Sequence, residues 1–397
     1  MKGNKLLKML TLTVSHIVVA ALAVAVALFL NGEEYSKLET LKSLIHDKFI
    51  GQADITAMED AAASAMVDSL GDQWSYYIPA ASYKAHKEQK DNAYVGIGVT
   101  IAVRDDGKGF DVLLVASGGS AQEAGVLPGD IMTHVEGQPV TEMGTDGASN
   151  QIRGQEGTFV NVTFLRDEQV LELRLERKII RVAVAEWQML PDEIGYIKIN
   201  NFNNNCSDET IAAIEELTGQ GARALIFDVR NNPGGYKDEL VKVLDHLLPE
   251  GPVFRSISYD GTERVDQSDK RCLELPMAVM FNGNSYSAAE FFAAALEEYD
   301  WAVTVGDPTS GKGYFQQTYQ LGDGSAVGLS VGKYTTPNGV SLAEVGGLQP
   351  KVLVEVDAQT AAMIYAKVLE PAEDPQLQAA VQTLLQEMEV DNSAENG

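Results

Sequence analysis

Cysteine and histidine are scarce in this chain of 397 residues, which holds two cysteines and five histidines. Neither Cys206 nor Cys272 has neighbours at the spacings typical of metal sites, so the sequence predicts no bound metal. Outside the cytoplasm the two cysteines could pair, but their separation in space cannot be read from the sequence. One disulfide and two free thiols therefore remain equal alternatives.

Positive charge is also in short supply. The chain has 30 lysines and arginines against 57 aspartates and glutamates, a formal net charge of -27. Proteins that bind nucleic-acid phosphates need clustered lysine and arginine. We therefore expect no nucleic-acid partner, and we interpret the acidic balance as a soluble surface.

Long apolar runs are absent except near the N-terminus. Residues 12–30 carry no ionised side chain at neutral pH apart from a partial charge on His16, and as a helix they would rise ~28 Å, about one bilayer core. Three lysines precede the run and two glutamates follow it, so the positive-inside rule places the rest of the chain outside the cytoplasm. We predict a cytoplasmic tip and single-pass anchor over residues 1–31. A signal peptide cleaved near Ala25-Val26-Ala27, which would give a secreted protein, is the alternative.

Four further regions follow from the periodicity of apolar residues. Residues 32–91 have helical spacing, and residues 92–177 form short β-branched runs separated by glycine turns, which indicates a small β domain. Strands and helices alternate over residues 178–357, which predicts a mainly parallel sheet flanked by helices. Residues 358–397 indicate a helical tail. The fold class is therefore multidomain α+β.

None of the histidines lies in a glycine-rich loop beside a strand end, so no residue is nominated for a Ser-His-Asp triad. Lys312 does occupy such a loop, in "GDPTSGKGYFQQ". Gly306 to Lys312 fits the phosphate-loop spacing G-x-x-x-x-G-K, but Gly313 replaces the serine or threonine that would hold magnesium, and the next residues alternate like a strand. An exposed loop lysine is the simplest alternative.

A lysine surrounded by apolar groups can instead serve as a general base, because burial disfavours its charged form. Lys312 could then remove the proton of a serine, as in Ser-Lys variants of the triad. Gln316 lies two pleats further on and is predicted to share the face of Lys312. It could hold the amine in place.

The stretch "NGNSYSAAEFFAAAL" supplies candidate serines, Ser285 and Ser287, before an apolar helix. Ser287 and Glu290 have the spacing of a capping box, which is a purely structural explanation. A helix N-terminus also favours negative charge, so a cap and a nucleophile can share the site. A third stretch, "ALIFDVRNNPGGY", ends a strand in Gly234 and Gly235, whose backbone N–H groups could form an oxyanion hole.

These three stretches, in this order, look like the signature blocks of the carboxy-terminal processing peptidases, the tail-specific serine proteases of family S41. Aligning the second block on Glu290 gives Ser287 the role of the nucleophile. The resemblance implies Lys312 as the base and Gln316 as its orienting residue. It also implies an oxyanion hole from Ala288 and one glycine of the Gly234-Gly235 turn, a ClpP/crotonase-like core of mixed sheet and helices, and no cofactor or metal.

The region before the core resembles the PDZ domain of the same family, in "YVGIGV", "SAQEAGVLPGDIMTHVEG" and "IRGQEGTFVNVTFLR". In PDZ domains a peptide adds as a strand and backbone N–H groups of a loop receive its terminal carboxylate. That loop is predicted at Gly96, Ile97, Gly98 and Val99. Arg153 matches an arginine that in the family couples peptide capture to the active arrangement. Tyr286 departs from the usual alanine and is expected to narrow the cleft.

We therefore expect a membrane-anchored serine endopeptidase on the outer side of a bacterial cell membrane. It would cleave proteins or peptides with accessible C-termini, with recognition and activation by its PDZ domain. A catalytically inactive, membrane-tethered peptide-binding scaffold is the alternative, and the presence of Ser287, Lys312 and Gln316 together favours catalysis. Apolar residues in the terminal helices are consistent with a homodimer or with one completed core.

Overall fold

The computed structural model describes residues 37–104 and 106–395. The predicted anchor over residues 1–31 lies outside this range. Among the described residues, no helix is long and apolar enough to cross a membrane. The chain divides into two compact units, Met1–Leu70 and Gly71–Gly397.

The described part of the first unit is helical, as its periodicity predicted. It contains α2 (Lys37–Lys48) and α3 (Ile55–Asp68). Asp54 caps α3 by accepting a hydrogen bond from the backbone nitrogen of Ala57 at 3.0 Å, and Lys42 pairs with Glu59. Of the described residues in this unit, only Val67 is buried.

The second unit begins with a strand, β1 (Tyr76–Ile78), followed by α4 (Ala80–Lys90). The sequence predicted helix throughout residues 32–91, and the prediction is wrong at β1. The aromatic and β-branched residues there favour a strand, and β1 pairs antiparallel with β18 (Ala326–Thr335) far along the chain.

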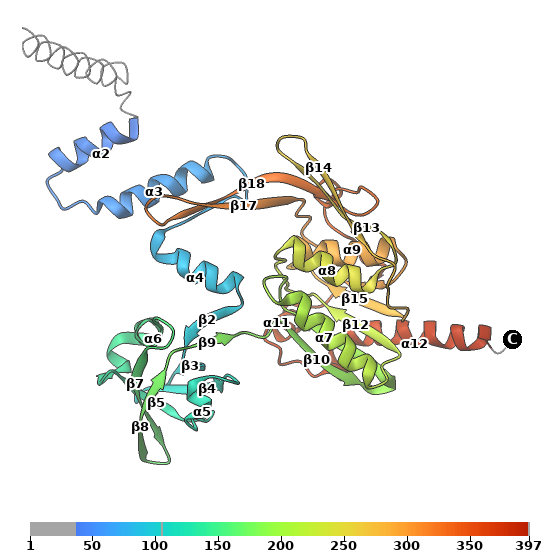
Figure 1. The fold of residues 1–397 in the computed structure, drawn as a ribbon, viewed down its shortest axis with the longest axis horizontal. Helices are drawn as coiled ribbons and strands as arrows, with labels where there is room; N and C mark the ends of the chain where they lie inside the picture. Colours follow the sequence, from blue (N-terminus) through green and yellow to red (C-terminus); the bar gives the residue numbers. More distant parts are fainter. Residues whose placement is uncertain (1–36, 105, 396–397) are drawn as a thin grey trace, which may run out of the picture. The chain divides into compact units, whose positions relative to one another are not determined.

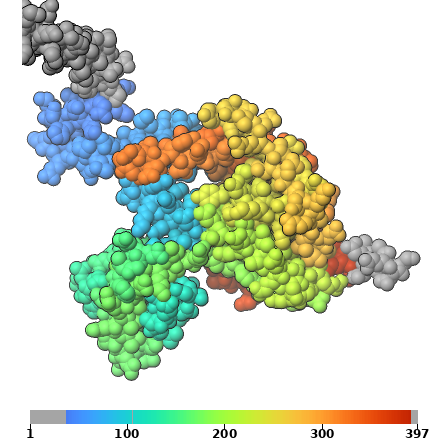
Figure 2. Space-filling view, in the orientation of Figure 1, coloured from blue at the N-terminus to red at the C-terminus, as the bar shows by residue number. Residues whose placement is uncertain are grey.

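The predicted small β domain lies between β2 (Ala93–Gly96) and β9 (Lys178–Arg181), which pair antiparallel where the chain enters and leaves it (teal to green in Figure 2). Its sheet contains β3 (Val99–Val103), β4 (Phe110–Val115), β5 (Ile131–Val135), β7 (Phe159–Arg166) and β8 (Gln169–Glu176), with β6 (Gln138–Pro139) paired to β5. The helices are α5 (Ser120–Glu123) and α6 (Val140–Ile152). Phe110, Met132 and Phe164 lie in a core that belongs to this domain alone.

The core sheet follows the predicted parallel pattern. Its order is β10 (Ala185–Leu190), β11 (Ile194–Ile199), β12 (Ala224–Asp228), β15 (Met277–Phe281), β16 (Val303–Gly306) and β19 (Val352–Leu353), with only the β10–β11 pair antiparallel. Asp228 is opposite Met280, and Phe281 is opposite Gly306. Strands β12, β15 and β16 therefore end at one edge, where the three signature stretches begin.

Helices cover both faces of this sheet (Figure 1). One face packs against α7 (Cys206–Gly219), α8 (Lys237–Leu247) and α9 (Ala288–Glu298), and the other packs against α12 (Pro375–Glu395). Successive strand residues point to opposite faces, so Phe227 joins the first core and Ile226 the second. Both faces of β12 and β15 are consequently buried, which explains their continuous apolar runs.

A second sheet borders the core. It has the order β1, β18, β13 (Gly251–Ser258), β14 (Glu263–Ser268), and β17 (Tyr314–Gln320) also pairs with β18. Short helices α10 (Leu342–Val345) and α11 (Ala358–Tyr365) and two 3-10 turns, Pro191–Glu193 and Pro371–Glu373, complete the described elements. Both cysteines are described and both are free thiols, so the disulfide alternative is wrong for this structure.

Candidate active site

A cavity of about 870 Å³ gathers most of the predicted catalytic residues. Gly235, Ser287, Ala288, Lys312 and Gln316 all line it, although they come from three different segments of the chain. Tyr334, Phe254 and Phe315 contribute aromatic walls. The residues that the sequence nominated therefore lie around one cavity, whereas no motif indicated its aromatic residues.

Ser287 lies between β15 and α9, in an unusual backbone conformation. Its φ is 59° and its ψ is -127°, a region that costs energy for any residue other than glycine and that often marks a functional position. The predicted capping box with Glu290 is present. The Ser287 Oγ also lies 2.7 Å from the Tyr334 Oη, so the two hydroxyls share a hydrogen bond. Tyr334 is almost fully buried, which raises the pKa of its phenol and keeps it neutral.

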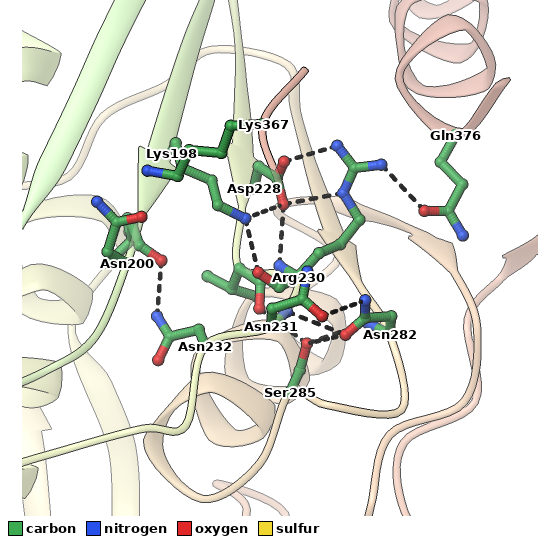
Figure 3. Close-up of polar contacts among 12 residues, drawn as sticks. Lys198, Asn200, Asp228, Arg230, Asn231, Asn232, Asn282, Ser285, Lys367 and Gln376 are labelled. Atoms are coloured by element: carbon green, nitrogen blue, oxygen red, sulfur yellow. Dashed lines mark hydrogen bonds and ion pairs between the residues drawn. The ribbon is translucent and has the colours of Figure 1, made fainter. Parts of the chain in front are cut away.

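Ser285 has a different environment. Its Oγ donates to the carbonyl of Val229 at 2.8 Å and accepts from the backbone nitrogen of Asn282 at 3.0 Å (Figure 3). The side chain is fully buried. Ser285 therefore links the turn after β15 to the end of β12. Its hydroxyl is occupied by these two hydrogen bonds.

Glu290 joins the serine segment to the lysine loop. Its carboxylate is fully buried and accepts four hydrogen bonds. Oε2 accepts from the backbone nitrogens of Ser287 (2.8 Å) and Lys312 (2.9 Å), and Oε1 accepts from Gly311 N (2.6 Å) and Thr309 Oγ1 (2.5 Å). Burial raises the pKa of this carboxyl, and the four donors oppose the rise. The sequence predicted Glu290 only as a helix cap, because its contact with the lysine loop is non-local.

Lys312 has its ammonium beside aromatic rings. Nζ lies 4.5 Å from the ring centroid of Trp74 and 5.8 Å from that of Tyr286, and it donates no hydrogen bond to any residue in the described ranges. Burial, with a smaller contribution from the charge of Lys90, lowers the pKa of the amine to about 8. A large fraction of this amine is therefore neutral at slightly alkaline pH, as a general base requires.

Gln316 lines the cavity, but its amide contacts neither Lys312 nor Ser287. Nε2 donates to the carbonyl of Tyr314 at 3.1 Å and to Ser330 Oγ at 3.0 Å. The pairing of β17 with β18 shifts register between Phe315 and Gln316. The simple alternation used in the sequence prediction does not hold across such an irregularity.

The two glycines after β12 differ in their hydrogen bonding. The Gly234 nitrogen donates to Asn232 Oδ1 at 2.8 Å, whereas the nitrogens of Gly235 and Ala288 have no acceptor in the described part of the chain. Both positions require glycine. A Cβ on Gly234 would lie 2.8 Å from the Ser287 Cβ, and one on Gly235 would lie 2.2 Å from the Phe202 carbonyl carbon. Gly234 also has a φ of 81°.

A buried ionic cluster supports this glycine turn from the side of β12 (Figure 3). Arg230 donates to Asp228 through Nε (3.0 Å) and Nη2 (2.7 Å), and to Asp374 through Nη1 (3.0 Å) and Nη2 (2.7 Å). Lys198 donates to Asp228 at 3.0 Å and to the Arg230 carbonyl at 2.6 Å. Burial alone would raise the pKa of Asp228, but the charges of Arg230 and Lys198 hold it below its usual range.

The cluster extends to the start of α12. Gln376 accepts from Arg230 Nη1 at 3.0 Å and donates to Asp307 Oδ2 at 2.9 Å, so it reaches the end of β16. Asn231 and Asn282 exchange hydrogen bonds between the ends of β12 and β15. The three strand ends that carry the signature stretches are thus linked by buried polar side chains. No sequence motif pointed to Asp374 or Gln376.

The predicted PDZ loop joins β2 to β3. Gly96 ends β2, Val99 begins β3, and the side chain of Ile97 is buried in the domain core. Gly98 has a φ of 83°, and a Cβ there would lie 3.2 Å from the Gly119 Cα, so glycine is required.

Arg153 follows α6. Its Nη1 donates to Glu88 Oε2 on α4 at 2.9 Å, and its guanidinium carbon lies 5.1 Å from the ring centroid of Tyr94. Arg153 therefore joins the small β domain to α4, the helix that also carries Lys90.

Comparisons with known proteins agree with this architecture. Residues 193–354 match the model of peptidase family S41, and residues 95–176 match that of the PDZ domain. The "Probable CtpA-like serine protease" of Staphylococcus haemolyticus is 30% identical over 322 residues, which are 80% of this chain and 64% of that protein. Its namesake from Staphylococcus aureus strain COL is 29% identical over 327 residues, 81% and 64% of the two chains.

The chain thus spans slightly less than two thirds of the length of these curated relatives. A solved structure, the "Putative S41 protease from Bacteroides fragilis", aligns over 89% of this chain and 98% of its own with a TM-score of 0.52 and 15% identity, which establishes a shared fold. The predicted resemblance is confirmed: this chain carries a peptidase domain of family S41 together with a PDZ domain.

Proposed function

We propose that this chain is a serine endopeptidase that cleaves proteins or peptides near their C-termini through an acyl-enzyme. The observation that carries the proposal is the shared cavity of Ser287 and Lys312, whose backbones are tied to one carboxylate of Glu290. The lowered pKa of Lys312, about 8, supports its role as the base. The similarity to CtpA-like serine proteases agrees with this activity.

In the proposed reaction, Ser287 Oγ attacks a peptide carbonyl while the neutral Lys312 amine takes the hydroxyl proton. The N–H groups of Gly235 and Ala288, which have no other acceptor in the described structure, would stabilise the oxyanion. Lys312 then returns the proton to the leaving amine, which breaks the peptide bond. A water, deprotonated by the same lysine, hydrolyses the ester and frees Ser287.

This reaction requires a rearrangement. The Ser287 hydroxyl is paired with Tyr334 and the Gln316 amide with Ser330, so the serine must turn toward Lys312 and the glutamine toward the amine that it is proposed to orient. We propose that peptide capture favours this change. The loop Gly96–Val99 would receive the peptide carboxylate, and the contact between Arg153 and Glu88 offers a route to α4.

The remaining parts of the proposal concern location and assembly. We propose a single-pass anchor at residues 1–31 in a bacterial membrane, the peptidase outside the cytoplasm, and substrates with accessible C-termini. The homodimer remains a prediction from the sequence. The domain limits given in the sequence analysis also remain predictions. The PDZ domain supports peptide binding, since this is how such domains act in general.

An inactive peptide-binding scaffold is favoured by one observation, the bond of Ser287 to Tyr334 in place of Lys312. To separate the two functions, the purified chain is incubated with an unstructured peptide that has an apolar C-terminus. We expect cleavage by the native chain, none by Ser287→Ala or Lys312→Ala, and native cleavage by the control Lys333→Ala, whose exposed lysine lies outside the cavity. Undiminished cleavage by either active-site variant would contradict the peptidase. Stoichiometric binding without turnover would indicate the scaffold.

A further inference from the structure

The sequence led us to expect that Tyr286 narrows the cleft, but the structure places its side chain elsewhere. Its side chain is half-buried and is not among the residues that line the cavity. Its ring lies 5.8 Å from the ring of Trp74, centroid to centroid, at an interplanar angle of 37°. Lys312 Nζ lies within 6 Å of both rings, at 4.5 Å from Trp74 and 5.8 Å from Tyr286. Both rings therefore lie beside the lysine amine.

Hydrogen bonds hold the backbone segments that carry both rings. The Trp74 nitrogen donates to Asp72 Oδ1 at 3.1 Å, and Ser75 Oγ donates to Asp72 Oδ2 at 2.6 Å while accepting from the Ser330 nitrogen at 3.0 Å. The residues that follow Ser75 form β1, which pairs with β18, so the segment that carries Trp74 is attached to the second sheet. Tyr286 donates its backbone N–H to the carbonyl of Asn232 at 3.2 Å. The two backbone segments that carry the rings are thus held by separate sets of hydrogen bonds.

We propose that Trp74 and Tyr286 form an aromatic cover that excludes water from the Lys312 amine and so maintains it as a neutral base. This inference rests on the proposed function of Lys312. It makes Tyr286, a residue at which this chain departs from the family it resembles, a positioning residue that acts through Lys312.

Two opposite effects of the rings have to be weighed. An aromatic face attracts a cation by about 0.5–2 kcal/mol, which would raise the pKa of the amine, whereas loss of water lowers it. The charged groups that act on Nζ are Lys90 on α4, which lowers the pKa, and Asp72 and Glu290, which raise it. Burial is nevertheless the largest influence, and the pKa falls to about 8. In the proposed cover, exclusion of water outweighs the attraction of the rings, and the titration described below measures that balance.

The inference predicts the behaviour of Tyr286→Ala, which restores the residue usual in the family. Water reaches the amine, its pKa rises, and the acid limb of kcat/KM against pH moves to higher pH by about one unit. That corresponds to about tenfold lower kcat/KM near pH 7, with little change once the amine is neutral in both proteins. Trp74→Ala moves the limb in the same direction. Tyr286→Phe keeps the ring and should have the native profile.

A direct titration tests the cover without turnover. In a Ser287→Ala background, side-chain ¹³C resonances of labelled lysine are followed with pH, and Lys312→Met identifies the resonance of interest. We expect a higher pKa for Lys312 after Tyr286→Ala and an unchanged one after Tyr286→Phe. An unchanged or lower pKa after Tyr286→Ala would overturn the cover, and so would equal shifts in both variants. Activity that survives Lys312→Met would instead refute the proposed base, whatever the titration gives.

Tyr286→Leu guards against a folding defect of the alanine variant, because it keeps apolar volume beside Trp74 and should shift the pKa less than Tyr286→Ala does. If the pKa of Lys312 rises as much in Tyr286→Leu as in Tyr286→Ala, the bulk of the side chain is not what keeps water from the amine, and the proposed cover is contradicted.

Discussion

The backbone nitrogen of Lys312 lies 2.9 Å from Oε2 of Glu290, and the same oxygen accepts from the nitrogen of Ser287 at 2.8 Å. One buried atom thus fixes the distance between the backbone of the proposed nucleophile and that of the proposed base. The side chains of Ser287 and Lys312 can still rotate, because Glu290 holds only their backbones. In the proposed mechanism the rearrangement therefore involves side-chain rotamers, while the two backbone segments stay in place.

Glu290→Gln should lower kcat by about 10- to 100-fold and destabilise the fold by about 1–3 kcal/mol. The amide has one acceptor oxygen for four donors, and its NH₂ would face backbone N–H groups, which leaves buried donors unsatisfied. Steady-state kinetics and urea unfolding measure the two effects. Glu344→Gln, at an exposed position of α10, is the control and should change neither. Native kcat in Glu290→Gln would show that this frame is dispensable.

Gly234→Ala should abolish turnover, whereas Gly261→Ala should not. The two glycines have φ angles of 81° and 82°, so alanine costs each about the same backbone strain, about 1 kcal/mol. A Cβ on Gly234 would meet the Ser287 Cβ at 2.8 Å, while one on Gly261 would meet nothing within 4 Å. Kinetics combined with thermal unfolding compares them. Equal activity in the two variants would contradict the close packing of the glycine turn on the serine.

Lys312→Met should remove activity and yet stabilise the fold at neutral pH. The pKa of the amine is about 8 in the folded chain and 10.5 in the reference state, so the folded state binds fewer protons between these values and stability rises with pH across this window. Below pH 8 the whole cost of burying the charge is present. The free energy of unfolding, measured from pH 7 to pH 10.5, should rise less with pH in the variant. A parallel dependence in both proteins would refute the lowered pKa.

Arg230→Met should cost about 3–5 kcal/mol of stability, because it leaves the carboxylates of Asp228 and Asp374 buried without their shared cation. The matched control is Arg271→Ala. Its side chain is 91% exposed and pairs with Asp269 on the surface, so the change should be within about 1 kcal/mol. Urea unfolding of both variants gives the comparison. A loss in Arg230→Met as small as in the control would mean that the cluster contributes nothing net.

The sequence predicted the parallel sheet and the location of the site because those features are local. Each signature stretch directly follows an apolar strand, and these parallel strands end at one edge of the sheet. The pairing of Ser287 with Lys312 was expected from the resemblance of the stretches to one family. The S41 and PDZ assignments are confirmed. They could be predicted because their motifs are short stretches that occur in a fixed order along the chain.

The partners of these residues were not predicted because they are distant in sequence. Tyr334 is 47 positions from Ser287, and Asp374 is 144 positions from Arg230, so no spacing rule connects them. Gln316 shows a second reason why the sequence alone did not predict the contacts of the site. Its position was inferred from regular alternation, but the register shift beside Phe315 directs its amide to Ser330. Irregularities of this kind depend on the partner strand and leave no mark in the local pattern.

The separation of 144 positions between Arg230 and Asp374 also bears on the order in which the protein is made. Synthesis proceeds from the N-terminus, so the glycine turn, the serine and the lysine all leave the ribosome before the first turn of α12. Until Asp374 arrives, Arg230 lacks half of its carboxylate partners and the neighbouring turn is incompletely supported. The proposed peptidase would thus complete its active site only after the segment that carries Asp374 has been synthesised.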